Sequence, residues 1–166
     1  MIDFFIFPTA RGWVGLLASS KGLMRLVLPL QDQEEVLREL GQLAETPHNP
    51  SAFGDLPQRI TRYLSGERVK FADAVDLDGS SPFQRRVLGR LRRIPYGQTR
   101  SYGWVARAVG VPQGPRAVGQ AVARNPVPLI IPCHRVVGTN GLGGFGGGLD
   151  LKRLLLRQEA GGPPAS

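Results

Sequence analysis

The sequence LIIPCHRVV, residues 129–137, joins a short apolar run to the only cysteine of this 166-residue chain. Cys133 follows Pro132 and is itself followed by His134 and Arg135. The segment thus brings a soft nucleophile, a titratable base and a fixed cation to the end of a buried run. A lone cysteine most often only packs in a core, but the histidine and the basic neighbours favour a reactive thiolate. We therefore expect a catalytic site here, with Cys133 as the nucleophile.

His134 is the predicted base for Cys133. If the chain is extended at this point, adjacent side chains point to opposite faces, so a water molecule would have to relay the proton. A histidine base needs an acceptor that orients it, and the second half of the chain contains only two acids, Asp150 and Glu159. We prefer Glu159, at the end of the last predicted helix, and Asp150 is the alternative.

Two short helices joined by a turn are predicted before this segment. Ser101 is a suitable N-cap for a helix that ends near residue 109, and Pro115 suits the first position of a second helix that ends near residue 124. Gly110 and residues 112–114 make the turn between them. Two helices connected in this way form a helix-turn-helix pattern, which occurs in DNA-binding proteins and also in ordinary cores.

The second helix of this pair has two features of a ligand-binding surface. Arg116 lies in its first turn, where the helix dipole disfavours a cation by about 0.3–1 kcal/mol, so either a partner or packing of the side-chain stem has to compensate. Gly119 and Ala121 are small enough to let the helix backbone approach a ligand closely, although tight packing on the first helix explains some of these small residues. Prolines at positions 126, 128 and 132 then predict a rigid extended connector over residues 125–133.

Two further helices and a loop complete the second half of the chain. Ser81 caps a predicted helix over residues 82–94, whose arginines face away from its apolar stripe. Residues 138–148 contain seven glycines in eleven positions, which predicts a loop that approaches a ligand closely or moves. Residues 149–159 form the closing helix. Its expected inward residues are Leu151, Leu154 and Leu155.

The first half of the chain predicts a small unit of strands and helices. Residues 2–7, 12–18 and 23–28 are apolar runs separated by turns, which indicates a three-stranded meander. One helix is expected over residues 32–45, and another from the N-cap Asp55 to about residue 65. The residues expected to face inward from these helices are Val36, Leu37, Leu40, Leu43, Ile60 and Leu64.

Charge reverses near VDLDGS at residues 75–80, which marks the expected domain boundary. Residues 1–78 contain 8 Lys and Arg against 11 Asp and Glu, whereas residues 79–166 contain 13 against 2. We expect an N-terminal α/β domain over 1–78 and a C-terminal domain over 79–166 that binds a polyanion, most commonly nucleic acid. No apolar run approaches the ~18 residues of a membrane span, so we expect a cytoplasmic protein without a signal peptide.

In its second half the chain resembles the family of O6-alkylguanine-DNA alkyltransferases. The motif PCHRV is preceded by IPYGQTRSY, RAVG and NPVP and is followed by GGFGGGLDLKRLLLRQE. The likeness runs from residue 83 to residue 159, and over residues 1–78 it is one of layout only. The resemblance implies an α+β fold, in which a ribonuclease-H-like N-terminal domain with a small three-stranded sheet precedes a mainly helical C-terminal domain containing a helix-turn-helix.

The same resemblance implies a DNA repair protein that flips an alkylated guanine out of double-stranded DNA. The alkyl group would move from O6 of the guanine to the thiolate of Cys133 in one irreversible step, without turnover. His134 would act as the base through a water, Glu159 would hold His134, and Asn125 would brace the turn before the active site.

The remaining implied roles concern DNA and the flipped base. Tyr102 would rotate a phosphate and donate to the base, and Arg116 would fill the gap left in the base stack. The implied DNA-binding residues are Tyr102, Arg116, Gly119, Ala121 and Arg135, and the implied guanine-binding residues are Tyr102, Val136, Phe145 and Gly146.

The sequence departs from the family pattern in ways that concern substrate range and rate more than the reaction. Phe145 stands where many members have Tyr, Gly146 where some have Ser, and Gly89 replaces an aromatic residue. Some members carry zinc on N-terminal cysteines, and this chain has none there. We therefore expect no metal. We also expect that the protein needs no cofactor and is a monomer.

Two other interpretations use the same residues. A DNA-binding module that recognises lesions without chemistry would only pack Cys133 in its core, but related proteins of that class have Trp at the cysteine position. A cysteine hydrolase would also use Cys133 and His134, and it would need an acyl substrate and repeated turnover.

Overall fold

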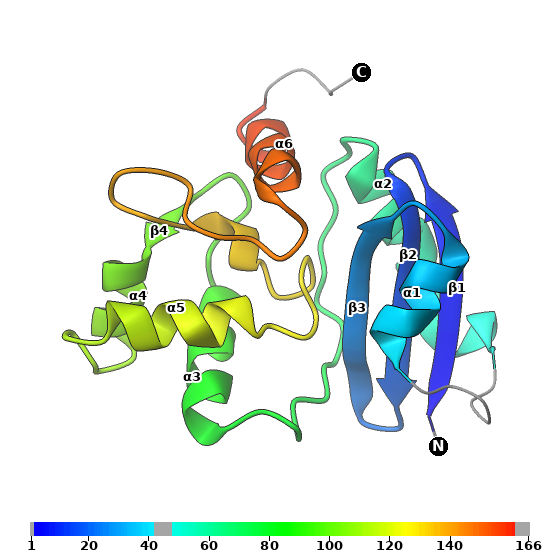
Figure 1. The fold of residues 1–166 in the computed structure, drawn as a ribbon, viewed down its shortest axis with the longest axis horizontal. Coiled ribbons are helices and arrows are strands. Elements are labelled where there is room, and N and C mark those ends of the chain that lie inside the picture. Colours follow the sequence, from blue (N-terminus) through cyan, green and yellow to red (C-terminus); the bar gives the residue numbers. More distant parts are fainter. Residues whose placement is uncertain (1, 42–47, 162–166) are drawn as a thin grey trace. The chain divides into compact units, whose positions relative to one another are not determined.

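The computed structural model describes residues 2–41 and 48–161 and divides the chain into two compact units, Met1–Leu77 and Asp78–Ser166. The first unit contains a small antiparallel sheet with helices, and the second is mainly helical (Figure 1). The α+β class and the small three-stranded sheet predicted from the sequence are therefore confirmed. No helix among the described residues has the length and apolar character needed to cross a membrane.

The sheet of the first unit is a simple meander of β1 (Asp3–Thr9), β2 (Gly12–Ser19) and β3 (Gly22–Leu30) in the order β1-β2-β3. Each strand runs slightly beyond the predicted range. Pro8, expected in a turn, lies within β1 opposite Trp13. A proline is tolerated there because β1 is an edge strand, so its missing N–H does not break a second ladder.

Helix α1 (Gln33–Leu40) packs against this sheet. Its N-cap Asp32 accepts a hydrogen bond from the Glu35 backbone N–H at 2.8 Å, which fixes the start of the helix. Val36 and Leu40 are buried in the cluster that the helix forms with β1 and β3. Gly15 in β2 permits this contact, because a Cβ atom there would lie only 2.4 Å from the Val36 side chain.

Two expectations for this helix were wrong. Helix α1 ends at Leu40, five residues before the predicted end, because Gly41 adopts a positive φ and its N–H caps the last carbonyls. Leu37, expected inward, is 37% exposed, since the helix turns only its Val36 and Leu40 face to the sheet. Leu43 lies outside the described residues.

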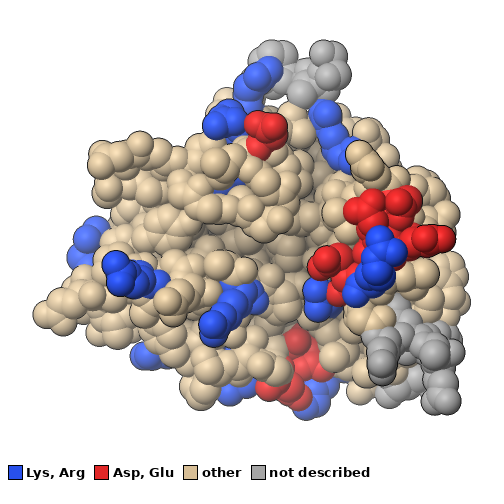
Figure 2. Space-filling view, in the orientation of Figure 1, with Lys and Arg blue, Asp and Glu red and all other residues tan. Residues whose placement is uncertain are grey.

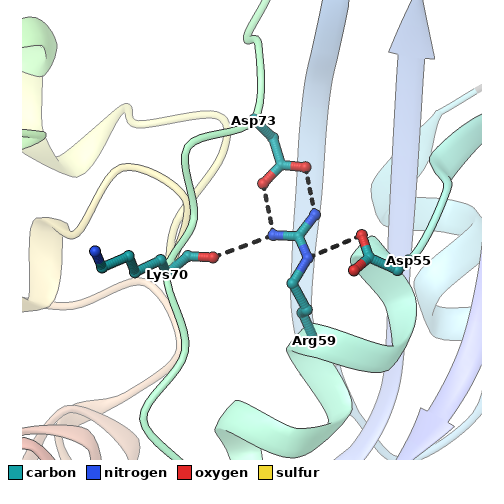
Figure 3. Close-up of polar contacts among 4 residues, drawn as sticks. All are labelled: Asp55, Arg59, Lys70 and Asp73. Carbon is teal, nitrogen blue, oxygen red and sulfur yellow. Dashed lines mark hydrogen bonds and ion pairs between the residues drawn. The ribbon is translucent and has the colours of Figure 1, made fainter.

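The segment before residue 78 is tied to helix α2 (Leu56–Leu64) by one arginine. After a short 3₁₀ turn, η1 (Pro50–Phe53), α2 buries Ile60 and Leu64 as predicted. Arg59 donates to both carboxylate oxygens of Asp73, at 2.8 and 2.7 Å, and to the Lys70 carbonyl at 3.2 Å (Figure 3).

Asp55 occupies the predicted N-cap position of α2, but its carboxylate does not cap the helix. It accepts a hydrogen bond from Arg59 Nε at 3.0 Å instead (Figure 3). Farther along the segment, the Ala74 carbonyl accepts from the Leu23 N–H, and the Asp76 N–H donates to the Leu23 carbonyl. The segment is thus anchored to both α2 and the sheet.

The second unit is built on three helices that pack on one another, α3 (Pro82–Leu91), α4 (Tyr102–Ala108) and α5 (Pro115–Ala123). Ser81 and Ser101 cap α3 and α4 as predicted, since their hydroxyl oxygens accept from the backbone N–H groups of Gln84 and Trp104. A short parallel pair, β4 (Arg100–Ser101) and β5 (Val136–Val137), joins the start of α4 to the segment after Cys133.

Residues 125–133 are not the predicted extended connector, because the chain turns back on itself within them. The Ile131 N–H donates to the Val127 carbonyl at 3.0 Å, and Leu129 adopts a φ of +75°. The Asn125 side chain closes the turn by donating to the Ile131 carbonyl at 2.9 Å and accepting from the Val127 N–H at 3.0 Å. The prolines exclude a helix here, but a side-chain amide supplies the hydrogen bonds of a turn.

Helix α6 (Leu149–Glu159) closes the unit with an unexpected inner face. Of the three leucines predicted to point inward, only Leu155 is fully buried. The other buried side chains of α6 are Lys152, Gln158 and Glu159. The closing helix therefore directs polar groups into the unit, and these groups form part of the site described next.

Candidate active site

Cys133 is a buried thiol at the first position of a 3₁₀ turn, η2 (Cys133–Arg135). Burial raises the pKa of the thiol, while a hydrogen bond from Asn125 and the charge of Lys152 act in the opposite direction. We expected basic neighbours to lower this pKa, but burial outweighs them. The direction of this shift favours the neutral thiol, which becomes nucleophilic when a base removes its proton.

The base and its carboxylate lie together as predicted. His134 Nε2 is 2.8 Å from Glu159 Oε2, and each side chain is only 1% exposed. Burial lowers the pKa of His134, and the hydrogen bond and charge of Glu159 partly offset this. Asp150, the alternative acid, is fully exposed and pairs with Arg153 on the outside of α6. The 3₁₀ turn also replaces the extended chain that was assumed at Cys133.

Arg135 was predicted to contact DNA, and the structure uses its guanidinium inside the unit. Nε and an η nitrogen donate to the two Glu159 oxygens at 2.8 and 2.9 Å, and the other η nitrogen donates to the Ile94 carbonyl at 2.8 Å. Its guanidinium also lies over the Tyr96 ring. These contacts favour an internal role, in which Arg135 orients the Glu159 carboxylate toward His134.

Lys152 is a site residue that the sequence did not predict. Its side chain is fully buried, and Nζ donates to the carbonyl oxygens of Val136 at 2.7 Å, Gly144 at 3.0 Å and Leu142. Burial lowers the pKa of Lys152, and the nearby Cys133 raises it. One ammonium group thus fastens the glycine-rich loop to the segment after the cysteine and places a positive charge near the thiol.

A signal for Lys152 existed in the helix spacing. Lys152 precedes Glu159 by seven residues, or two helical turns, so an inward Glu159 requires an inward Lys152. The leucines of this helix concealed the relation, because Leu151 and Leu154 mark a neighbouring stripe as apolar.

Tyr102 lies between α5 and the glycine-rich loop. A Cβ atom at Gly119 would be 3.9 Å from the Tyr102 ring, and one at Gly143 would be 2.7 Å from its hydroxyl oxygen. Burial raises the pKa of Tyr102, a backbone hydrogen bond at Gly144 lowers it, and the charge of Cys133 raises it. The tyrosine hydroxyl, the small face of α5 and the thiol are therefore brought to one place.

Of the other predicted site residues, two are exposed to solvent and three are half-buried or buried. Arg116 is exposed in the first turn of α5, and Gly146 is exposed in the loop. Phe145 approaches His134 edge-on, with 6.5 Å between the ring centroids. Val136 is buried and offers its carbonyl to Lys152. Ala121 is only 6% exposed, so it packs in the core and does not lie on a ligand-facing surface.

Charge around the site suits a polyanion. In the view of Figure 2, acidic side chains gather over α1, whereas α4 and α5 show only basic charged side chains. Within residues 2–41 and 48–161, no three His, Cys, Asp or Glu side chains are grouped so that they could hold a metal ion. A buried thiol beside a carboxylate-held histidine, in a unit whose helices are basic, is typical of the class of proteins that form a covalent bond at cysteine while they hold a polyanion.

Comparisons with known proteins identify the family within this class. Residues 82–161 match the family model described as 6-O-methylguanine DNA methyltransferase, DNA binding domain. The methylated-DNA--protein-cysteine methyltransferase of Mycolicibacterium paratuberculosis is 43% identical, over 84% of this chain and 90% of that protein. Its counterpart in Archaeoglobus fulgidus is 47% identical, over 68% of this chain and 79% of that protein.

A solved structure agrees over almost the whole chain. The crystal structure of Mycobacterium tuberculosis OGT in complex with DNA matches with a TM-score of 0.81 and 35% identity, covering 98% of this chain and 96% of that one. The chain belongs to the 6-O-methylguanine DNA methyltransferase family.

Proposed function

We propose that this protein repairs O6-alkylated guanine in double-stranded DNA by moving the alkyl group to Sγ of Cys133. The observation that carries the proposal is the buried contact between His134 and Glu159 next to the only thiol of a chain in this family. In the reaction an S–C bond forms and the C–O6 bond breaks. The thiol proton ends on the guanine, so the products are a thioether and a normal base.

The groups around Cys133 support this proton path. Because Nε2 of His134 contacts Glu159, Nδ1 is the ring atom that would take the thiol proton, directly or through a water. The thiolate that results gains from the charge of Lys152 and the hydrogen bond from Asn125. Tyr102 would donate a hydrogen bond to the departing base. Water cannot hydrolyse the thioether, so each chain reacts once.

DNA binding is proposed for the helical pair of the second unit. Helices α4 and α5 with the turn at Gly110 would act as a helix-turn-helix, and α5 would present Gly119 and Arg116 to the flipped nucleotide. Flipping costs a few kcal/mol and less for a weakened base pair, which favours damaged guanine before any pocket contact forms. An inserted Arg116 side chain would offset part of that cost.

The finer architecture is also part of the proposal. We take the domains to be 1–78 and 79–166, with a ribonuclease-H-like arrangement in the first. The solved complex of the Mycobacterium tuberculosis relative with DNA supports a DNA ligand for the second. The protein would act as a monomer in the cytoplasm.

Intact mass measurement after incubation with a duplex that carries one O6-methylguanine tests the reaction. We expect a gain of one methyl group per chain, confined by peptide mapping to Cys133, and no gain for Cys133→Ser or for an undamaged duplex. Tight binding without a mass gain would show a lesion-binding module, and repeated product release would show a hydrolase.

A further inference from the structure

A basic hollow between α3 and α4 has no part in the proposed alkyl transfer. Its volume is about 440 Å³. The hollow is lined by two arginines of α3, by a third in the turn that follows α3, and by the end of α4, and its full lining is Arg86, Gly89, Arg90, Arg93, Ala108 and Val109. All of these residues belong to the second unit, and none of them was assigned to the active site.

The three arginines are not neutralised by the protein. Among residues 2–41 and 48–161, none of their guanidinium groups pairs with a carboxylate, and Nε of Arg90 is buried without a hydrogen-bond acceptor. Within residues 79–166 the only acids are Asp150 and Glu159, which pair with Arg153 and with His134 and Arg135. The positive charge of the hollow therefore calls for an external anion.

The hollow is held open and in position by its surroundings. Arg90 stacks on the Trp104 ring at 4.9 Å, and Arg100 lies against the same ring at 5.2 Å. Such cation–π contacts fix the direction of a side chain that would otherwise be mobile. A Cβ atom at Gly89 would meet nothing within 4 Å, so the absence of a side chain at this position leaves the hollow empty.

The spacing of the arginines fits a phosphodiester chain better than a single small anion. Arg86 and Arg90 stand at positions i and i+4, so they share one face of α3. Arg93 follows in the turn after the helix, where its N–H donates to the Arg90 carbonyl at 3.1 Å and continues the helical path for a further turn. They span about 10 Å along the helix axis, which corresponds to the rise of about three nucleotides of one DNA strand. Arginine also binds phosphate oxygens through two parallel hydrogen bonds.

The hollow is separate from the surface through which α5 would meet the damaged duplex. Helix α5 packs on both α3 and α4 and passes in front of them in the view of Figure 1. The lining of the hollow contains no residue of α5. A duplex held by Arg116 and Gly119 of α5 therefore leaves the hollow to another ligand.

We propose that this hollow binds the phosphate backbone of a second DNA segment while α5 holds the segment with the damaged base. The inference rests on the proposed function only in taking DNA as the ligand of the second unit. One chain would then contact two duplexes and bring two stretches of DNA together.

Native mass spectrometry of the full chain with an excess of a short undamaged duplex of about one helical turn tests this directly. We expect a complex of one chain with two duplexes at low salt. The second binding constant should fall with salt with a logarithmic slope of about −2.7 for three phosphate contacts. Arg86→Gln/Arg90→Gln/Arg93→Gln should retain the first duplex and lose the second.

Two controls separate this result from general charge effects. Arg38→Gln/Arg153→Gln/Arg157→Gln removes the same charge from exposed positions elsewhere and should still bind two duplexes. Gly89→Leu keeps every charge, favours the helix, and should lose the second duplex by filling the hollow. A wild-type stoichiometry of one duplex, or equal second binding in all variants, would overturn the proposal.

Methyl transfer distinguishes failure of this proposal from failure of the proposed function. The α3 variant should methylate at the wild-type rate on a short duplex with one O6-methylguanine, because that duplex is held by α5. A parallel loss of methylation and binding would place the hollow on the primary DNA surface and refute a second segment. Absence of methylation in the wild type would refute the proposed function alone.

Discussion

At the residue scale, Glu159 sets the pKa of His134, the base of the proposed reaction. It raises the pKa of His134 against the lowering effect of burial. Glu159→Gln should therefore lower that pKa further, so the acid limb of the single-turnover methylation rate moves to lower pH. The plateau rate should fall by about 10²-fold, because a less basic and poorly oriented imidazole is a weaker general base.

The matched control is Asp150→Asn, which alters the exposed acid of the same helix and should leave rate and pH profile unchanged. Rates measured from pH 5 to 8 on a methylated duplex decide the matter. A plateau loss without any displacement of the acid limb would mean that Glu159 only supports the fold. Thermal unfolding of the variant reports that contribution separately, since Arg135 loses its partner as well.

Lys152 joins stability to thiol chemistry at the same scale. Lys152→Met keeps an unbranched side chain that is one atom shorter, and it removes three hydrogen bonds and the charge that lowers the pKa of Cys133. We expect slower labelling of Cys133 by iodoacetamide at pH 8 and a loss of about 1–3 kcal/mol in unfolding free energy, since buried carbonyls lose their donor. Arg153→Met is the exposed control. Faster labelling would show that loop opening outweighs the electrostatic effect.

At the scale of elements, Arg59 decides whether the segment before residue 78 stays on α2. Hydrogen bonds between charged groups contribute about 1.5–3 kcal/mol when they are partly buried, so Arg59→Gln should lower the unfolding free energy by about 2 kcal/mol. Amide hydrogen exchange at residues 70–76 should accelerate. Asp55→Asn removes the partner that is 73% exposed and should cost under about 1 kcal/mol. Equal effects of the two variants would contradict the role given to Asp73.

The elements also show where sequence reasoning succeeds. The starts of α3 and α4 could be predicted because Ser81 and Ser101 cap them through contacts only three residues long. The turn over residues 125–131 could not, because the proline pattern is compatible with both an extended chain and a turn. The choice depends on Asn125 reaching Ile131. Local signals were sufficient where a local contact fixes the backbone.

Some residues of the site could likewise be predicted from the sequence, and others could not. His134 and Glu159 could be paired from the sequence because the second half of the chain offers only two acids. The inward Lys152 and the internal Arg135 depend on which face α6 turns to the 3₁₀ turn, and this is a property of the packed unit. Basic side chains were counted correctly as a group, but a count does not show which of them bind within the protein.

At the scale of the whole molecule, the charge asymmetry acquires a structural meaning. Of the two acids in residues 79–166, Glu159 forms an ion pair with Arg135 inside the site, and Asp150 forms one with Arg153. Among the described residues, Arg86, Arg90 and Arg93 pair with no carboxylate, so their charge acts outward. This distribution makes affinity for DNA steeply dependent on salt and leaves the fold of the second unit dependent on apolar packing, because its surface charges repel one another.

Stability of the whole chain should be greatest between two titrations set by the site. Burial lowers the pKa of His134 below 6.5, so the unfolded chain takes up a proton first and stability falls as pH drops below about 6.5. Burial raises the pKa of Cys133 above 9.0, so the unfolded thiol loses its proton first and the contribution of Cys133 to stability falls as pH rises above about 9, while the lowered pKa of Lys152 acts in the opposite direction. Each group contributes at most about 1.4 kcal/mol per pH unit.

Guanidinium unfolding from pH 5 to 10 should show both limbs of the stability curve, with Cys133→Ser flattening the alkaline limb and His134→Gln flattening the acid limb. His48→Gln, at an exposed position, is the control. An alkaline limb that persists in Cys133→Ser would assign that limb to another group.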